Sequence, residues 1–351
     1  MSAKKSQAKS KPAKANSKVA TFSFADLFAG IGGMRFAFEG VGGECVLTSE
    51  IDETALHTYR MQPWNSDSEQ HVYVNDVVVL GAKPASKIPD FDVLVAGFPC
   101  QPYSIAGLRQ GFEDEKGRGQ VFLSILDVLK KKKPKAFMLE NVKGMLSHDQ
   151  GRTIQYMVEQ LQTAGGKSLI YDVLQPTVLN SMTHGGVPQN RERVFMVGFL
   201  KGTDYSDFVW PEPIKLNKTL RGVLEKRTVP EKYFYTQEKY DCYKEIRQHV
   251  KSRDTAYQWR RAYVRENKSG VCPALTANMG SGGHNVPLVL VDDGIRKLTP
   301  RECMCLQGFD QYPFRLPNDI ADAHLYHQFG NSVTVPLIER IASEIAQVIT
   351  S

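Results

Sequence analysis

Strand-like and helix-like segments alternate through the first 200 residues, and this alternation is the strongest constraint on the fold. Short apolar stretches typical of buried strands occupy residues 21–28, 46–50, 72–79, 91–97, 136–140 and 194–199. Apolar residues at helical spacing occur between them, at 34–39, 121–129 and 153–163. Strands separated in this way lie parallel in one sheet whose two faces are covered by helices. We therefore expect an α/β fold with a doubly wound, mostly parallel sheet.

The chain has 351 residues, which is long enough for two domains. Residues 1–20 contain six Lys and no Asp or Glu, and their composition predicts a disordered basic tail. Regular periodicity weakens after residue 210, and it returns at 296–307 and in a helical pattern at 336–349. We expect a larger domain at 21–200, a smaller domain at 201–324, and a C-terminal segment at 325–351 that completes the larger domain.

Positive charge is concentrated in two segments, although the net charge of the chain is only +6. Besides the tail, residues 215–270 hold 15 Lys and Arg against 7 Asp and Glu, so the rest of the chain is acidic. Local basic segments indicate a polyanionic partner such as a nucleic acid, and the alternative is a solvated basic face.

The six cysteines include no CxxC pair, which argues against a disulfide framework or a zinc site. We therefore expect a reducing compartment and no bound metal. The sequence has no apolar run of the length of a membrane span and no apolar signal segment near its beginning. These features predict a cytoplasmic protein without a membrane anchor.

Cys100 follows the strand-like stretch 91–97 in the run Gly-Phe-Pro-Cys-Gln-Pro-Tyr-Ser. A thiol placed where a buried strand gives way to a loop can attack a bound substrate, provided that its surroundings favour the thiolate. The alternative is a buried structural cysteine, the commonest role of a free cysteine. Residues 104–119 contain Arg109, Arg118 and four glycines, which suits a basic loop that closes over a substrate.

Three successive strand ends carry residues suited to a nucleotide-like cofactor. Residues 26–33 (Asp-Leu-Phe-Ala-Gly-Ile-Gly-Gly) form a glycine-rich turn after the first strand, where open α/β sheets bind ligands, but the spacing is not that of a dinucleotide site. Glu50 ends the second strand and suits ribose hydroxyls, and Asp76 ends the third and suits an adenine amino group. We expect an adenosine-containing cofactor here, and a plain surface acid is the alternative for Glu50.

A second polar group follows the later strands. Glu140 ends an apolar strand, and burial there would raise its pKa and make it a proton donor, unless the strand end faces solvent. Arg191 and Arg193 precede another strand two residues apart, so we expect them to face the same way. They would hold the acid, the substrate base or a phosphate, and ordinary ion pairing is the alternative.

Five motifs in order resemble the DNA (cytosine-5)-methyltransferase family, and in particular the compact enzymes of bacterial restriction–modification systems. They are DLFAGIGG at 26–33, GFPCQPYS at 97–104, MLENV at 138–142, QNRERV at 189–194 and QFGNSV at 328–333. The resemblance covers roughly residues 22–200 and 272–349. It implies a Rossmann-like S-adenosylmethionine-dependent methyltransferase fold, with residues 201–324 as a target-recognition domain.

The resemblance also implies a role for each matching residue. Cys100 would attack carbon 6 of a cytosine flipped out of the duplex, and Glu140 would contact ring nitrogen 3 and the amino group. Arg193 would contact the base oxygen and Arg191 would support the site. The residues expected to bind S-adenosylmethionine are Phe28, Gly30, Gly32, Glu50, Ile51, Asp76, Val77, Val121, Asn331 and Ser332.

DNA contacts are expected from the catalytic loop and from the densest basic and aromatic cluster of the recognition segment. The residues concerned are Gln101, Ser104, Arg109, Arg118, Trp259, Arg260, Arg261 and Arg265. Residues 276–283 resemble the end of the recognition region, and their glycines would let the backbone approach DNA. The chain departs from the family at Ile51, where relatives have an aromatic residue, and at Cys305 and Asp310.

These expectations amount to a DNA (cytosine-5-)-methyltransferase (EC 2.1.1.37) that modifies a short specific site in double-stranded DNA. We expect a monomer that protects host DNA, with a restriction endonuclease acting on the same site as an associated activity. The alternatives are a tRNA cytosine-5 methyltransferase, which the long basic recognition segment disfavours, and a catalytically inactive DNA-binding protein, which the intact Cys100, Glu140 and Arg193 disfavour. A NAD-dependent dehydrogenase is disfavoured by the glycine spacing.

Overall fold

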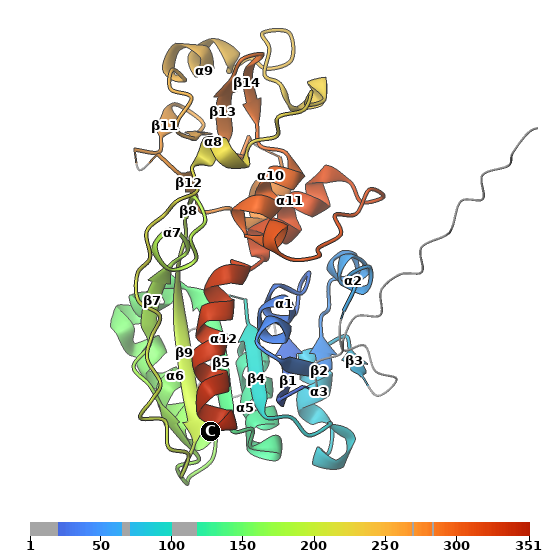
Figure 1. Cartoon of the computed structure of the whole chain (residues 1–351), viewed down its shortest axis with the longest axis vertical. Helices are drawn as coiled ribbons and strands as arrows, with labels where there is room; N and C mark the ends of the chain where they lie inside the picture. The colour runs from blue at the N-terminus through green and yellow to red at the C-terminus, as the bar shows by residue number, and fades with distance from the viewer. Residues whose placement is uncertain (1–19, 65–70, 100–117, 269, 283) are drawn as a thin grey trace, which may run out of the picture.

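A computed structural model describes residues 20–64, 71–99, 118–268, 270–282 and 284–351, without the side chains of residues 118 and 119. Figure 1 shows a sheet lobe below and a small lobe above. The sheet lobe comprises residues 20–200 and helix α12 (Val335–Thr350), and the small lobe comprises residues 219–297. Residues 298–332, here called the bridging segment, lie between the two lobes.

The sheet lobe is built on an eight-stranded sheet with the order β3-β2-β1-β4-β5-β9-β6, in which β7 also pairs with β9. The strands are β1 (Phe22–Leu27), β2 (Gly43–Ser49), β3 (Val72–Val74), β4 (Val93–Gly97), β5 (Ala136–Val142), β6 (Tyr171–Val173), β7 (Thr177–Asn180) and β9 (Glu192–Leu200). β1 to β5 are parallel, whereas β9 runs antiparallel to β5, β6 and β7. The expected α/β fold with a mostly parallel sheet is confirmed.

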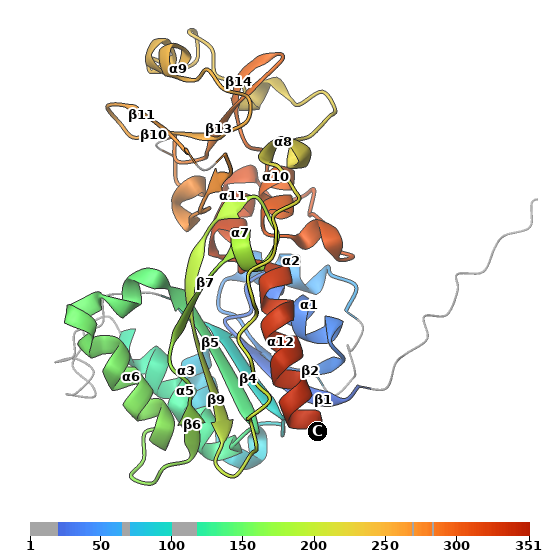
Figure 2. The ribbon, with the colours of Figure 1, turned by 60° about the vertical axis from the view of Figure 1, so that its left-hand side comes forward.

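Helices cover both faces of this sheet, as alternation predicts. α1 (Gly33–Gly40) and α12 share one apolar core with Phe24, Val95 and Val197. On the other face, residues of α3 (Val77–Ala82), α5 (Arg118–Lys132) and α6 (Arg152–Thr163) share a second core with Leu27 and Leu94. Figure 2 shows α6 and α12 on opposite sides of the sheet. Strand side chains therefore alternate between two cores, which fixes the register of each strand.

Near the third strand, one predicted strand is shorter than expected and one helix was not predicted. Residues 72–79 were expected to form one strand, but β3 ends at Val74 and α3 begins at Val77. The cause is Asp76, whose carboxylate accepts a hydrogen bond of 2.8 Å from the backbone N–H of Val78 and caps the helix. α2 (Glu53–Arg60) was not predicted, and it begins in the same way at Asp52.

The bridging segment packs into the same core as α1 and α12. It contains α10 (Pro300–Leu306), η6 (Phe309–Gln311) and α11 (Asp322–Asn331). Phe309 and Phe329 from this segment contact each other and belong to the core that also holds Ile338 of α12. The expected domain limits at residues 200 and 324 stay a prediction.

The small lobe has an antiparallel sheet of its own, with the order β11-β10-β13-β14. Its elements are α8 (Leu220–Val223), η4 (Glu231–Tyr233), α9 (Tyr243–His249), β10 (Tyr257–Trp259), β11 (Val264–Glu266), β13 (Leu288–Val291) and β14 (Gly294–Lys297). Tyr235, Ile246, Tyr257 and Leu288 form a separate apolar core. Other residues of the lobe, among them Leu220, Tyr233 and Val289, belong instead to the core that contains α1 and α12, so the lobe has a core of its own and is also packed against the rest of the chain.

Short elements connect the lobes or border the sheet. They are η1 (Ala85–Lys87), η2 (Lys143–Leu146), η3 (His148–Gly151), α7 (Ser181–His184), β8 (Gln189–Asn190), β12 (Cys272–Pro273) and η5 (Ala277–Gly280). β8 and β12 pair in parallel. This pairing joins the residues directly before β9 to the segment between β11 and β13 of the small lobe. Among the described residues, no helix combines the length and apolar character needed to cross a membrane.

A buried ion pair holds the base of the small lobe against α10. Arg296 of β14 and Glu302 of α10 are 1% and 0% exposed, and their side chains form two hydrogen bonds of 2.8 and 2.6 Å. Glu302 also accepts a hydrogen bond from the backbone N–H of Thr299, the residue that caps α10. Removal of Glu302 would therefore leave a buried guanidinium without its counter-charge and weaken the start of α10.

We predict that Glu302→Ala lowers the free energy of unfolding by about 3–5 kcal/mol, the usual cost of breaking one side of a buried pair. The control is Asp292→Ala, because the carboxylate of Asp292 is 82% exposed and its pairing with Arg253 should contribute at most about 1 kcal/mol. Urea denaturation of both variants measures the difference. Equal losses would show that the Arg296–Glu302 pair is not a principal contact of the small lobe.

Candidate active site

A cavity of about 350 Å³ opens at the carboxyl ends of the parallel strands. Its walls come from the turn after β1, the end of β2, the end of β4, the end of β5 and the turn between α11 and α12. Strand ends of a parallel sheet meet at one edge, so residues far apart in sequence converge there. The cavity therefore lies where the glycine-rich turn and the strand-end acids were expected to bind a ligand.

The glycine-rich turn forms the floor of one half of this cavity. Phe28 and Gly30 both have positive φ values, 60° and 56°, so the backbone turns sharply after β1. The N–H of Gly30 donates a hydrogen bond of 2.7 Å to Oε2 of Glu50. Gly32, the residue that precedes α1, does not line the cavity, and a Cβ there would overlap the ring of Trp64.

Glu50 and Ile51 form the side of the cavity next to this turn. Oε1 of Glu50 accepts a hydrogen bond of 2.8 Å from the backbone N–H of Asp52, and burial raises the pKa of Glu50. Ile51 is 67% exposed, whereas Glu50 and Asp52 on either side of it are half-buried, so Ile51 presents an apolar surface at the cavity wall. A carboxylate beside an apolar side chain fits a ribose and the face of an adenine ring. The chemistry of these residues therefore fits an adenosine-containing ligand.

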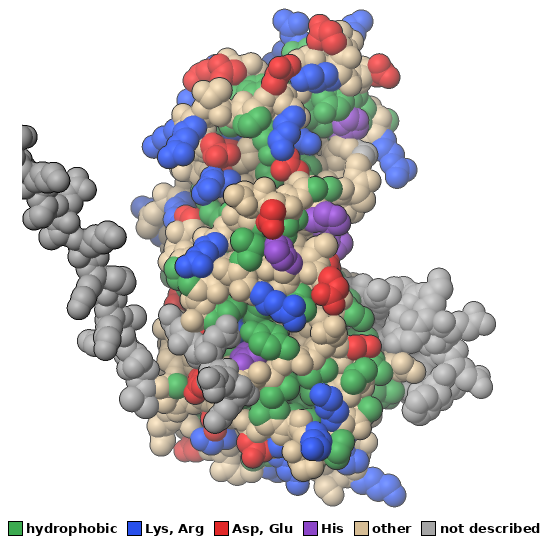
Figure 3. Space-filling model, turned by 90° about the vertical axis from the view of Figure 1, so that its right-hand side faces the viewer, with side chains coloured by type: hydrophobic (Ala, Val, Ile, Leu, Met, Phe, Trp, Pro, Cys, Tyr) green, Lys and Arg blue, Asp and Glu red, His purple; other side chains and the backbone are tan. Residues whose placement is uncertain are grey.

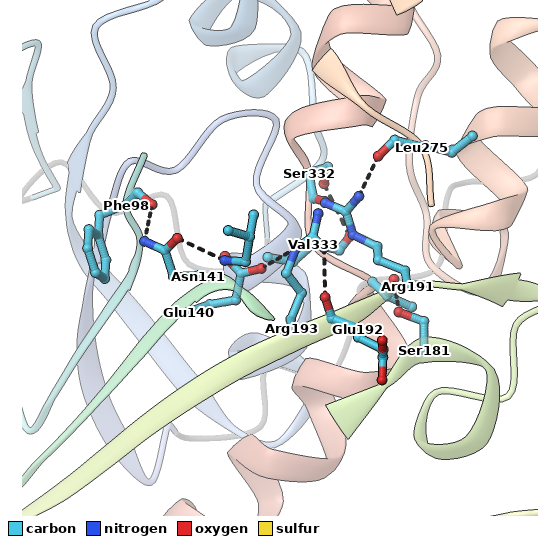
Figure 4. A network of polar contacts seen from close by, with 12 residues as sticks. Phe98, Glu140, Asn141, Ser181, Arg191, Glu192, Arg193, Leu275, Ser332 and Val333 are labelled. Atoms are coloured by element: carbon cyan, nitrogen blue, oxygen red, sulfur yellow. Dashed lines mark hydrogen bonds and ion pairs between the residues drawn. The ribbon is translucent and has the colours of Figure 1, made fainter. Parts of the chain in front are cut away.

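The other half of the cavity contains an acid paired with a cation (Figure 4). Glu140 lies near the end of β5, two residues before Val142, and is 8% exposed. Its Oε1 lies 3.0 Å from Nε of Arg193. The next residue, Asn141, donates a hydrogen bond of 3.0 Å to the carbonyl oxygen of Phe98. Glu140 is therefore held by an ion pair, and its strand is tied to the segment that leads to Cys100. Phe98 and Pro99 both line the cavity.

Arg191 also lines the cavity, but its partners are backbone groups. It is 2% exposed and donates hydrogen bonds to the carbonyl oxygens of Leu275 at 2.7 Å, Ser332 at 2.6 Å and Gly330 at 3.2 Å. Burial lowers the pKa of Arg191, and the charge of Arg193 lowers it further. Arg191 and Arg193 thus share one cavity, as expected, yet one holds loops together and the other holds the acid.

Two glycines allow α11 to lie directly against η5. A Cβ at Gly330 would overlap the backbone of Thr276 and Ala277, and a Cβ at Gly280 would overlap the backbone of Ala323. The glycines of 276–283 were expected to let DNA approach the backbone, but Gly280 serves contact with α11 instead. This contact places Asn331 and Ser332, both predicted to bind the cofactor, in the wall of the cavity.

Asp26 lies behind the glycine-rich turn and was not assigned a role from the sequence. It is completely buried, and burial raises its pKa to about 8, against the opposing effect of the nearby Arg35. Arg35 itself hydrogen-bonds Glu39 at 2.7 Å and the hydroxyl of Tyr59 at 3.0 Å. Sequence reasoning also missed His327 and Asp52, which line the cavity.

Several predicted residues lie elsewhere or cannot be placed. Asp76, Val77 and Val121 are not among the residues that line the cavity, and their assignment as cofactor contacts stays a prediction. Cys100, Gln101, Ser104 and Arg109 lie outside the described residues, as does the side chain of Arg118, at the first position of α5. Pro99 in the cavity wall is the described residue next to Cys100.

The basic and aromatic cluster that was predicted to contact DNA forms a hairpin of the small lobe. Trp259 ends β10, Arg265 lies in β11, and Arg260 and Arg261 are exposed in the loop between them. The loop is closed by a hydrogen bond of 2.8 Å from the N–H of Arg260 to the carbonyl oxygen of Tyr263, and Arg261 has a φ of 62°. Figure 2 shows this hairpin projecting from the side of the small lobe away from α8.

Comparisons with known proteins agree with this geometry. Residues 22–347 match the family model of the C-5 cytosine-specific DNA methylases. The chain is 44% identical over 323 residues to the Type II methyltransferase M.Bsp6I of Bacillus sp. (strain RFL6), covering 92% of this chain and 97% of that protein. It is 37% identical over 345 residues to the Type II methyltransferase M.HpaII of Haemophilus parainfluenzae, covering 93% and 89%.

Solved structures show the same fold at lower sequence identity. The S. pombe Dnmt2 methyltransferase matches with a TM-score of 0.67 at 18% identity, over 93% of this chain and 98% of that one. A putative DNA modification methyltransferase from an E. coli prophage matches with a TM-score of 0.63 at 19% identity, over 94% and 99%. The matched family model spans nearly the whole chain, and its relatives align over most of their length. The protein therefore belongs to the C-5 cytosine-specific DNA methylase family.

Proposed function

We propose that this protein methylates carbon 5 of a cytosine within a short specific site of double-stranded DNA, with S-adenosylmethionine as the methyl donor. The observation that carries the proposal is a cavity that holds the Glu140–Arg193 pair beside Glu50, Ile51 and the turn at 330–333. One end suits a cytosine and the other suits an adenosine. Its similarity to Type II methyltransferases supports a protective role in a restriction–modification system.

In this proposal Cys100 and Glu140 have different roles toward the base. The Cys100 thiolate adds to carbon 6 of the flipped cytosine, while Glu140, positioned by Arg193, binds ring nitrogen 3 and the amino group. This addition places negative charge on carbon 5, the atom that becomes methylated. Loss of the proton from carbon 5 then expels Cys100 and restores the aromatic ring.

The cofactor end of the cavity is assigned to residues of three segments. They are Phe28 and Gly30 of the glycine-rich turn, Glu50 and Ile51 after β2, and Asn331 and Ser332 before α12. Glu50 would accept hydrogen bonds from ribose hydroxyls, and Ile51 would cover the adenine with an aliphatic side chain. When bound, S-adenosylmethionine supplies an electrophilic methyl group. The residues of this chain orient it and exclude water.

Recognition of the DNA site is assigned to the small lobe. In Figure 3, Lys and Arg side chains appear as separate clusters on both lobes of this face, not as one continuous patch. Attraction between these side chains and DNA phosphates does not depend on the base sequence, so it cannot by itself select a site. We assign base reading to the hairpin that carries Arg260 and Arg261. A monomeric state and an associated restriction endonuclease stay predictions.

We predict that, in the presence of S-adenosylmethionine, DNA with 5-fluorocytosine at the target position forms a stable covalent adduct with the wild-type protein, because after methyl transfer the fluorine cannot leave carbon 5 as a proton does. Cys100→Ser should form no adduct and transfer no methyl group, yet it should still bind the same duplex. Denaturing gel electrophoresis and a binding assay measure the two properties. Full turnover by Cys100→Ser would exclude the covalent mechanism. Offering tRNA in place of DNA tests the alternative substrate.

We predict that substitutions at the two ends of the cavity have separable effects. Glu140→Gln should lower the methylation rate strongly and leave cofactor affinity near that of the wild type, because Glu140 is assigned to the base. Glu50→Ala should weaken cofactor binding first. Glu53→Ala is the control, since Glu53 is exposed in the first turn of α2 and does not line the cavity. Calorimetry with S-adenosylhomocysteine decides, and equal cofactor defects in both variants would contradict this division of the cavity.

We predict that the two basic segments contribute differently to DNA binding. Removal of residues 1–20 should reduce the salt dependence of binding without changing the methylated sequence. The slope of log affinity against log salt should fall by roughly 0.9 for each phosphate that the tail neutralises. Truncation of Arg260 or Arg261 should weaken cognate binding more than random binding, by roughly 1–3 kcal/mol if the side chain forms a bidentate pair with a base. Bisulfite sequencing first identifies the site. A double variant that weakens both duplexes equally would refute base reading by this hairpin.

A further inference from the structure

His327 connects the end of the cavity that we assign to the cofactor to η5. It lies on α11 one turn before Asn331, and both residues line the cavity. Its Nδ1 is 3.0 Å from the carbonyl oxygen of Ala277, and its Nε2 is 2.9 Å from Nδ2 of Asn331. One imidazole ring thus contacts η5 on one side and a predicted cofactor residue on the other.

The hydrogen bond of His327 to Ala277 determines how the ring can bind Asn331. A backbone carbonyl oxygen can only accept a hydrogen bond, so Nδ1 of His327 must carry the proton. In a neutral ring Nε2 is then an acceptor, and Asn331 must turn its NH₂ group toward it. The amide oxygen of Asn331 is thereby left free of this contact and available to a ligand. The carbonyl of Ala277 thus determines the tautomer of His327, and that tautomer determines the orientation of the side-chain amide of Asn331.

The carbonyl of Ala277 is held firmly relative to α11. Gly330 and Gly280 bring the backbones of η5 and α11 into direct contact. Arg191 binds the carbonyl oxygen of Leu275, and Oε1 of Gln189 accepts a hydrogen bond of 2.9 Å from the N–H of the same residue. Ala277 is only half-buried and His327 is exposed, but the backbone that carries the carbonyl of Ala277 is packed directly against α11 and anchored at Leu275.

We propose that His327 is a positioning residue that orients the side-chain amide of Asn331, so that its Oδ1 accepts a hydrogen bond from the bound cofactor. The proposal rests on the assignment of this cavity end to S-adenosylmethionine. It adds a residue that acts through Asn331, and it gives the contact between η5 and α11 a function in cofactor binding beyond packing.

Two substitutions separate the contacts of the ring. His327→Asn places an amide nitrogen near the position of Nδ1, so it keeps the bond to Ala277 and loses the contact with Asn331. His327→Gln reaches the position of Nε2, so it keeps an acceptor for Asn331 and loses the bond to Ala277. The matched controls are His324→Asn and His324→Gln, because His324 is exposed one turn earlier on α11 and its side chain has no hydrogen bond within the described part of the chain.

Calorimetric titration with S-adenosylhomocysteine measures the effect without requiring activity. We expect His327→Asn to weaken binding about three- to ten-fold, the range for the removal of one hydrogen bond, while His327→Gln and both controls stay within about two-fold of the wild type. Thermal unfolding temperatures should be alike for the two His327 variants. Equal affinities for these variants would overturn the proposal. If the wild type does not bind the ligand, the proposed function fails instead.

A second measurement tests the local geometry independently of any ligand. Long-range ¹H–¹⁵N correlation spectra distinguish the two neutral tautomers of a histidine ring. We expect the ring of His327 to carry its proton on Nδ1 in the wild type at neutral pH. A proton on Nε2 would overturn the proposal, because the ring could not then accept from Asn331.

Discussion

The hydrogen bonds of Arg191 to three backbone carbonyls are the contacts on which the rest of the site depends. Leu275 lies between β12 and η5, whereas Gly330 is in the last turn of α11 and Ser332 follows that helix. A single guanidinium binds the carbonyl oxygens of all three residues. Carbonyl groups in buried irregular segments need a donor, and this side chain donates to three of them. The segment between β12 and η5 and the junction of α11 with α12 are therefore placed against each other by one side chain of the sheet lobe.

Much of the fold and part of the site could be predicted from local sequence pattern. Alternating strands and helices predicted the sheet, because strand and helix periodicities differ and each is set by near neighbours. The same pattern predicted a ligand site at the ends of the first three strands, and the glycine-rich turn and Glu50 do line the cavity, whereas Asp76 does not. It misassigned residues 75–79, where the side chain of Asp76 caps a helix and overrides the strand propensity of three valines.

The remaining features depend on partners that sequence spacing does not specify. Arg191 and Arg193 are two residues apart, yet their partners differ. Arg191 binds three backbone carbonyl oxygens, whereas Arg193 binds the carboxylate of Glu140. His327 lies on α11, and its partner Ala277 is 50 residues away. The glycines of 276–283 were predicted to let the backbone approach DNA, because the sequence does not reveal that α11 lies against Gly280. Long-range packing, not local propensity, decides each of these cases.

Three buried arginines show why Arg191 has an electrostatic effect as well as a structural one. Arg296 is paired with Glu302, and Arg35 is paired with Glu39, so each charge is compensated where it is buried. Arg191 makes no ion pair within the described part of the chain, and Glu140 in the same cavity is already engaged by Arg193. Arginine stays protonated in proteins, and a low-dielectric cavity screens its charge poorly. Glu50 and Asp52 lie in the part of the cavity wall that we assign to the cofactor, so the uncompensated charge of Arg191 is local to the end that we assign to the cytosine. With that assignment, we expect the charge of Arg191 to stabilise the negative charge that develops on the base after thiolate addition.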